Sequence, residues 1–266
     1  MSTDNERFVG VFDRAGADYQ QAAGPFVDAV ADLVAERAMA AQPGSVIDLA
    51  TGPGTVLAAL ERRGRTPELV GFDLAERQLQ AGRKRLADAK SRVRFAHMDV
   101  CSLQVKDRAA DVVTCSLGLP YLDDPLRAVR EAARVAKRGG LVLFTTFGRP
   151  IFGDAGDRLS WALDRSGVPR DPAPAAHGSE TLAQWAFRAN LQDVVIEEHD
   201  IPVRYPDLKT WWSVCDILAF LVRLEGESPD KTSAVQELLA DDERVVGPGG
   251  EVAQLVRICL LQARAG

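Results

Sequence analysis

Asp48, Gly52 and Gly54 are of residue types, and at a spacing, that would let the backbone approach a bound ligand closely. Within residues 46–56, a β-branched apolar run ends in Asp48, Gly52 and Gly54 follow, and an apolar helical pattern begins at Thr55. This order predicts a strand, a tight turn and the start of a helix. Because glycine has no Cβ, such a turn lets a ligand lie against the backbone. The spacing differs from the six-residue glycine pattern of dinucleotide-binding folds.

A second acid, Asp73, ends the apolar run 69–73. It follows the glycine turn by about 20 residues, where nucleotide-binding α/β folds place a carboxylate for ribose hydroxyls. A carboxylate accepts two hydrogen bonds from a vicinal diol, and its charge strengthens both. Asp73 is therefore a candidate ribose ligand.

The elements that must position these residues alternate between strands and helices. Asp124 and Pro125 are residue types preferred at the N-cap and first position of a helix. That helix is predicted to end in the basic and glycine residues 135–140. Further strands are predicted at 93–97, 111–115 and 141–147.

Taken in order, these motifs resemble those of class I S-adenosylmethionine-dependent methyltransferases. Asp48 and the shortened glycine pattern resemble motif I of that family, although Ala50 stands where the family has its first glycine. Asp99 matches an acid that, in the family, meets the exocyclic amine of adenine. The resemblance covers roughly residues 8–148. It is closest to the branch of ubiquinone/menaquinone-biosynthesis-type enzymes and small-molecule methyltransferases of bacterial secondary metabolism.

The resemblance implies S-adenosylmethionine as the cofactor and S-adenosylhomocysteine as its product. The residues it implies for cofactor binding are Asp48, Ala50, Thr51, Gly52, Gly54, Asp73, Leu74, Asp99, Val100 and Ser116.

Alternating strands and helices predict an α/β fold, with a parallel sheet covered on both faces. The resemblance makes this a Rossmann-like, seven-stranded, mostly parallel sheet with an antiparallel last strand, to which a mainly helical lid is added. The predicted divisions are the N-terminal helices and cofactor-binding core (1–148), a lid segment (149–179), a core helix and strand six (180–205), a helical lid insertion (206–250) and the last core strand (251–266).

Individual elements outside the five strands are also predicted. Gly24 and Pro25 are expected to introduce the first apolar helix, and residues 42–44 to stop it. The others are helices at 154–165, 181–189, 208–224 and 230–240, a Pro/Ala-rich stretch at 169–176, a turn at 247–250, and strands at 193–203 and 252–263.

Composition excludes several classes of protein. The chain has 266 residues, is 46% hydrophobic and carries a net charge of −6, which argues against a general nucleic-acid binder. No segment has the 18 or so apolar residues of a membrane span, and the polar N-terminus is no signal peptide. The four cysteines lack the spacing of a zinc or redox pair. We therefore expect a cytoplasmic protein, monomer or homodimer, with a small-molecule substrate, no metal, no nucleic acid and no membrane partner.

The predicted lid is rich in aromatic residues, and Trp161, Tyr205 and Trp212 are candidates to bind a substrate. The alternative is that such residues only pack the lid onto the core. Neighbours on a helix point about 100° apart, so Trp211 and Trp212 cannot share a face. Trp211 falls in the apolar stripe with Val214 and should pack on the core.

Methyl transfer is an in-line displacement that needs a well-placed nucleophile and the exclusion of water. A base helps when the acceptor is a hydroxyl or an acidic carbon. His177, in the lid, is one candidate, and Tyr19 and Tyr121 are others. Each also has an ordinary interpretation as a packing or surface residue.

Three classes of function follow. The first is transfer of a methyl group from S-adenosylmethionine to a small apolar or aromatic metabolite in secondary metabolism, such as natural product biosynthesis, with an O, N or C acceptor. The second is a methyltransferase-like enzyme that keeps the cofactor but catalyses another reaction, such as a cyclisation. The third is a non-catalytic binding protein, which would not need Asp48, Gly52, Gly54, Asp73 and Asp99.

Overall fold

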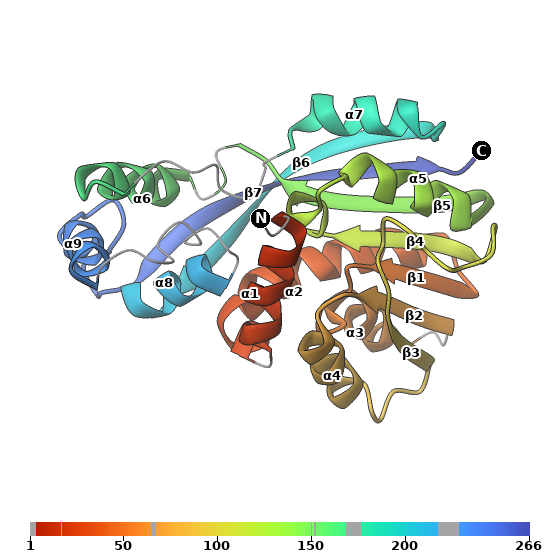
Figure 1. Ribbon diagram of the computed structural model, residues 1–266, viewed down its shortest axis with the longest axis horizontal. Coiled ribbons are helices and arrows are strands. Elements are labelled where there is room, and N and C mark those ends of the chain that lie inside the picture. The colour runs from red at the N-terminus through yellow and green to blue at the C-terminus, as the bar shows by residue number, and fades with distance from the viewer. Residues whose placement is uncertain are drawn as a thin grey trace.

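A single seven-stranded sheet organises the chain, in the order β3-β2-β1-β4-β5-β7-β6 (Figure 1). The computed structural model describes residues 4–16, 18–64, 68–149, 151, 153–168, 177–217 and 229–266. Strands β1 to β5 pair in parallel, and β7 pairs antiparallel with both β5 and β6. The fold class predicted from the sequence is confirmed. The strands are β1 (Ser45–Leu49), β2 (Glu68–Asp73), β3 (Arg92–His97), β4 (Ala110–Ser116), β5 (Ala136–Phe147), β6 (Gln192–Tyr205) and β7 (Val252–Arg264).

Helices cover both faces of the sheet. Helices α2 (Asp18–Ala40), α3 (Thr55–Arg62) and α4 (Glu76–Arg85) lie on one face, where Val34, Leu57 and Leu69 are buried together. Helices α5 (Pro125–Val135) and α7 (Ser179–Arg188) cover the other, around Val129, Phe144 and Leu182. Helix α1 (Asp4–Ala15) packs against α2, α4, α8 and the short 3₁₀ helix η1 (Leu119–Tyr121).

The last two strands extend beyond the rest of the sheet and carry a helical lobe (Figure 1). β5 pairs with β7 only from Ile258 onwards, whereas the β6–β7 ribbon continues to the pair Tyr205–Val252. Helices α6 (Gly153–Arg165), α8 (Leu208–Ile217) and α9 (Pro229–Ala240) surround this extension. The apolar cluster that holds the lobe together also includes Phe26 and Phe147 of the core, so lobe and core share one hydrophobic interior.

The start of α5 is as predicted, but its end is not. The side chain of Asp124 accepts the N–H of Arg127 at 3.0 Å, which makes it the N-cap, and Pro125 is the first helical residue. The helix stops at Val135, and residues 136–140 belong to β5. The two glycines pair with the chain end: the Gly139 N–H donates to the carbonyl of Ala265 at 2.8 Å, and the Ala265 N–H donates to the carbonyl of Gly140 at 2.9 Å. The glycines therefore lie in a strand and not in the helix stop that the sequence suggested.

The beginning of α2 also corrects a prediction. Gly24 and Pro25 do not introduce this helix, which begins at Asp18 and contains Pro25 in its interior. A proline there removes a backbone hydrogen bond and disfavours the helix. Helix α2 tolerates it because Phe26 and Val30 on the following turn are completely buried. Tertiary packing thus overrides the local signal.

The remaining predicted elements fall close to their expected places. The turn at 247–250 is confirmed, with the Gly247 N–H donating to the Glu251 carbonyl at 2.8 Å. Helix α8 is described as far as Ile217; residues 218–224 of the predicted helix and the stretch 169–176 lie outside the described residues. Among the helices that are described, none has the length and apolar character required to cross a membrane.

Candidate functional site

A pocket lies at the carboxyl ends of β1, β2 and β4, the edge at which ligands bind in open α/β sheets. Segments far apart in the sequence form it: helix α1, the start of α2, the glycine turn after β1, and the segments that follow β2, β3 and β4. Its lining residues are Phe8, Val9, Phe12, Tyr19, Ala50, Gly52, Pro53, Asp73, Leu74, Ala75, Gln78, Met98, Val100, Ser116, Leu117, Gly118, Tyr121 and Leu122.

The two glycines of the turn have different roles. Both have left-handed backbone angles, with φ of 53° at Gly52 and 69° at Gly54. A Cβ on Gly52 would meet no atom within 4 Å, whereas a Cβ on Gly54 would lie 2.7 Å from the ring of Phe95. Gly52 therefore keeps space open at the pocket wall, and Gly54 makes room for packing behind it. Ala50 also has a positive φ, of 50°, where a glycine would be less strained.

Asp48 supports the turn from beneath and does not line the pocket. Its carboxylate is 1% exposed and accepts hydrogen bonds from the hydroxyls of Thr51 at 2.7 Å and Thr114 at 2.6 Å. Burial raises the pKa of Asp48 to about 7, against the opposing effect of these two hydroxyls. The structure thus places Asp48 and Thr51, both predicted to bind the cofactor, behind the pocket wall.

Asp73 lies in the pocket wall at the end of β2, and both of its oxygens already have one partner. One oxygen accepts the N–H of Gly52 at 2.7 Å and the other the N–H of Ala75 at 2.9 Å. Burial raises the pKa of Asp73, and the backbone N–H groups counteract that rise. A carboxylate has about four acceptor positions, so each oxygen can accept a further donor from a ligand.

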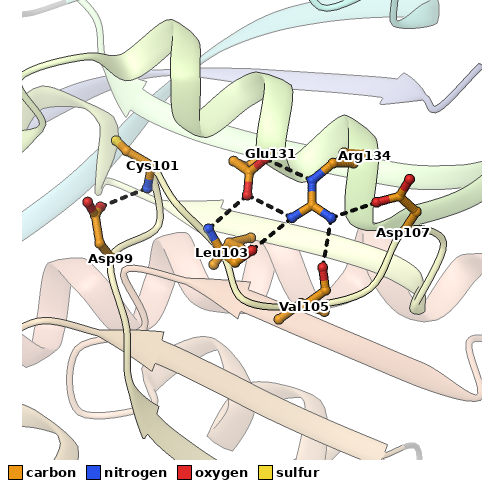
Figure 2. Close-up of polar contacts among 7 residues, drawn as sticks. All are labelled: Asp99, Cys101, Leu103, Val105, Asp107, Glu131 and Arg134. Atoms are coloured by element: carbon orange, nitrogen blue, oxygen red, sulfur yellow. Dashed lines mark hydrogen bonds and ion pairs between the residues drawn. The ribbon is translucent and has the colours of Figure 1, made fainter.

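The segment after β3 contributes Met98 and Val100 to the pocket, while Asp99 between them does not line it. Asp99 accepts the N–H of Cys101 at 2.8 Å (Figure 2). Arg134 of α5 clamps the segment further along: its guanidinium donates to the carbonyls of Leu103 and Val105 at 3.0 and 2.7 Å. It also pairs with Asp107 and with Glu131, and Glu131 in turn accepts the Leu103 N–H. This Arg134 clamp fixes the path of the chain that leaves the pocket.

Four aromatic rings form another part of the pocket wall. Phe12 contacts Tyr121 and Tyr19 edge to face, at 4.8 and 5.9 Å between ring centroids, and Phe8 contacts Tyr121 at 5.4 Å. Burial raises the pKa of both tyrosines, and the Asp73 carboxylate raises that of Tyr19 further. Both phenols are therefore protonated at neutral pH, so they can donate a hydrogen bond but do not act as a ready base.

The other predicted catalytic and substrate residues do not line the pocket. His177 lies against Trp185, 4.6 Å between centroids, and burial lowers its pKa, so its ring is neutral. Trp161 lies under the guanidinium of Arg158, 3.7 Å from the ring centroid. Tyr205 is buried and Trp212 half-buried in the cluster that joins the lobe to the core.

The structure brings together Ala50, Gly52, Asp73 and Ser116 at the pocket, with Leu74 and Val100. Gly54 and Asp99 are outside it, as are Asp48 and Thr51. Residues that the sequence did not single out include Phe8, Gln78 and Met98. No local signal marks Gln78, because its contacts come from a helix 66 residues away. In the described part of the chain, no group of three or more His, Cys, Asp or Glu side chains is placed to hold a metal.

Comparison with known proteins agrees with this geometry. Residues 47–144 match the family model of a methyltransferase domain. The chain is 38% identical over 122 residues to the demethylmenaquinone methyltransferase of Clavibacter sepedonicus, covering 46% of this chain and 45% of that protein. The chain spans about half the length of the first curated relatives it matches.

A longer match exists to the demethylmenaquinone methyltransferase of Renibacterium salmoninarum. It is 33% identical over 179 residues and covers 64% of this chain and 73% of that protein. Among solved structures, the YcgJ protein of Bacillus subtilis has a TM-score of 0.62 at 19% identity, covering 88% of this chain and 97% of that chain, which shows a shared fold. Together with the motifs and the sheet topology, the longer match places the chain in the family of class I S-adenosylmethionine-dependent methyltransferases.

Proposed function

We propose that the pocket binds S-adenosylmethionine and that the protein transfers its methyl group to a small apolar or aromatic molecule. The observation that carries this proposal is the position of Asp73. Its half-buried carboxylate lies in the pocket wall beside the open space at Gly52 and keeps acceptor capacity on both oxygens. Such a carboxylate suits the two hydroxyls of a ribose.

The residues around Asp73 fit the other parts of the cofactor. Leu74, Met98 and Val100 provide an apolar surface suited to the faces of an adenine ring. Gly52 leaves the backbone accessible, and Ser116 offers a hydroxyl at the end of β4. When bound, the cofactor supplies an electrophilic methyl group on a positively charged sulfur.

The aromatic wall supports an apolar or aromatic acceptor. Phe8, Phe12, Tyr19 and Tyr121 line one side of the pocket, and aromatic rings interact favourably with planar apolar molecules and with cations. The matched relatives are named as methyltransferases of demethylmenaquinone, a quinone-type acceptor, so hydroquinones are the first compounds to test. Secondary metabolism remains part of the proposal, on the resemblance of the sequence alone.

We also propose that the helical lobe covers the acceptor side of the pocket. Helix α8, which carries Trp211 and Trp212, packs against α1 and α2, the helices that bear three of the four rings of the aromatic wall. Tyr19, Tyr121 and Trp212 pack against the same buried cluster. If Trp212 or Tyr205 contacts a bound acceptor, that contact would therefore be made within this cluster.

The test is a screen of hydroquinones, phenols and amines with S-adenosylmethionine, followed by mass spectrometry. Methyl transfer predicts a product heavier by one methylene group and an equal amount of S-adenosylhomocysteine. A product of unchanged mass, formed only with the cofactor present and without release of S-adenosylhomocysteine, would favour the alternative of a cyclisation or related reaction. Absence of any cofactor binding would contradict both.

A further inference from the structure

Gln78 of α4 lines the pocket, and the two polar ends of its side chain have different surroundings. Its side-chain N–H donates to the carbonyl of Phe12 at 2.8 Å, across 66 residues of chain. A carbonyl oxygen can only accept, so the amide nitrogen must face Phe12 and the amide oxygen must face away from it. The side chain is 2% exposed and lines the pocket.

The amide oxygen of Gln78 is buried and has no hydrogen-bond partner among the described residues. Buried acceptors are almost always paired, because an unpaired one has lost its water without compensation. Asp73 and Ala75, just before it in the chain, border the same pocket. Gln78 thus brings an unpaired buried acceptor to the wall that Asp73 and Ala75 also line.

The nitrogen end of Gln78 holds the part of α1 that carries Phe12, one ring of the aromatic wall. The Phe12 carbonyl accepts both this N–H and the backbone N–H of Gly16, and the Phe12 ring itself lines the pocket. A second link lies beside it, because the carboxylate of Asp13 accepts the N–H of Arg77 at 2.8 Å. The last turn of α1 is thus tied to the first turn of α4.

We infer that Gln78 couples cofactor binding to the position of α1, which rests on the proposed function. Its amide oxygen accepts a hydrogen bond from a nucleoside donor of the bound cofactor, and its amide nitrogen holds Phe12. Occupancy of the cofactor part of the pocket thereby stabilises the aromatic wall that meets the acceptor. Coupling of this kind is reciprocal, so loosening α1 weakens cofactor binding by the same factor.

Hydrogen–deuterium exchange with S-adenosylhomocysteine as the probe tests this coupling without knowledge of the acceptor. In the wild type, we expect the amides of residues 4–16 to exchange several-fold more slowly with the probe bound. Gln78→Met has the same length but no amide; it should bind the probe about tenfold more weakly and show no slowing in α1 at equal saturation. Gln80→Met, on the exposed face of the same helix, should behave as the wild type.

The outcomes distinguish failure of the proposed function from failure of the coupling through Gln78. If the wild type does not bind S-adenosylhomocysteine, the proposed function fails and the coupling fails with it. If the wild type binds but Gln78→Met keeps its affinity within about twofold, or keeps the slowing in α1, only the coupling is overturned. Should Gln78→Met lose its cooperative melting, Gln78→Asn takes its place: it keeps an amide but is one methylene too short to reach both partners, and the same loss of coupling is expected.

Discussion

The carboxylate of Asp73 accepts the backbone N–H of Gly52 at 2.7 Å and so joins the end of β2 to the glycine turn after β1. The same carboxylate lies in the pocket wall. One side chain therefore shapes the turn and presents the acceptor atoms to a ligand. Two motifs that are 21 residues apart in the sequence act as a single site.

The different surroundings of Gly52 and Gly54 predict different effects of alanine. Gly52→Ala should fold, with a loss of about 1–2 kcal/mol from its left-handed backbone, and should bind S-adenosylhomocysteine poorly because its Cβ points into open pocket space. Gly54→Ala should lose about 1–3 kcal/mol more through overpacking against Phe95. Urea unfolding measures the change in stability, and calorimetric titration measures the change in binding. Adding Phe95→Leu should partly restore the stability of Gly54→Ala but not that of Gly52→Ala. Equal stability of the two alanine variants would contradict the assignment.

Asp48 predicts a dependence of stability on pH. Its pKa rises from 3.8 to about 7 on folding, so between these values the folded protein holds a proton that the unfolded chain has released. The free energy of unfolding should therefore fall as the pH rises through this window, by as much as about 4 kcal/mol from this group. Asp48→Asn cannot ionise, so its stability relative to the wild type should increase from about pH 4 to about pH 7. A difference that stays constant with pH would show that Asp48 is ionised throughout.

Lysine is predicted to be a poor substitute for Arg134 in the Arg134 clamp, in both protein stability and ligand binding. Arg134 uses its planar fork to bond Glu131 and two backbone carbonyls, and a lysine offers one compact charge in place of that fork. Arg134→Lys should lower the melting temperature by a few degrees and weaken S-adenosylhomocysteine binding several-fold, because the segment carrying Met98 and Val100 loosens. Arg130→Lys, exposed on the same helix, is the matched control. Identical melting of the two variants would show that the clamp does not matter.

Trp211 and Trp212 should differ sharply in their contribution to stability. Trp211 is completely buried, and its indole N–H donates to the side chain of Gln254 at 2.8 Å. Trp211→Ala should therefore cost about 3–5 kcal/mol of unfolding free energy. Trp212 is only half-buried, so Trp212→Ala should cost clearly less and leave cofactor affinity unchanged. Chemical denaturation gives both values. Similar losses of unfolding free energy would mean that the two rings are buried to a similar extent.

Much of the sheet could be predicted because its signals are local. Apolar runs ending in Asp48 and Asp73, and the capping pair Asp124-Pro125, each lie within a few residues of the element they specify. The helical spacing of Trp211 and Val214 also predicted the burial of Trp211. Failures occurred where distant segments meet: Gly139 and Gly140 pair with the chain end, and α2 continues through Pro25 because its next turn is buried.

The pocket shows the same division. The sequence marked Gly52 and Asp73, which the glycine turn and strand ends bring together. It did not mark Phe8 or Gln78, whose places depend on how α1 packs across the pocket. Aromatic composition alone suggested Trp161 as a substrate residue, and the structure places it in the lobe under Arg158. Site residues on local motifs could thus be predicted, whereas site residues that depend on contacts between distant segments could not.

Calorimetric titration of S-adenosylhomocysteine into the wild type and into Asp73→Asn tests the central claim most directly. The wild type should bind one equivalent, and Asp73→Asn should bind at least about tenfold more weakly, because it loses charge-assisted hydrogen bonds worth about 1.5–3 kcal/mol each. Asp88→Asn, the same change at an exposed position, should leave binding intact. No heat of binding from the wild type, or unchanged affinity in a folded Asp73→Asn variant, would contradict a cofactor site built around Asp73.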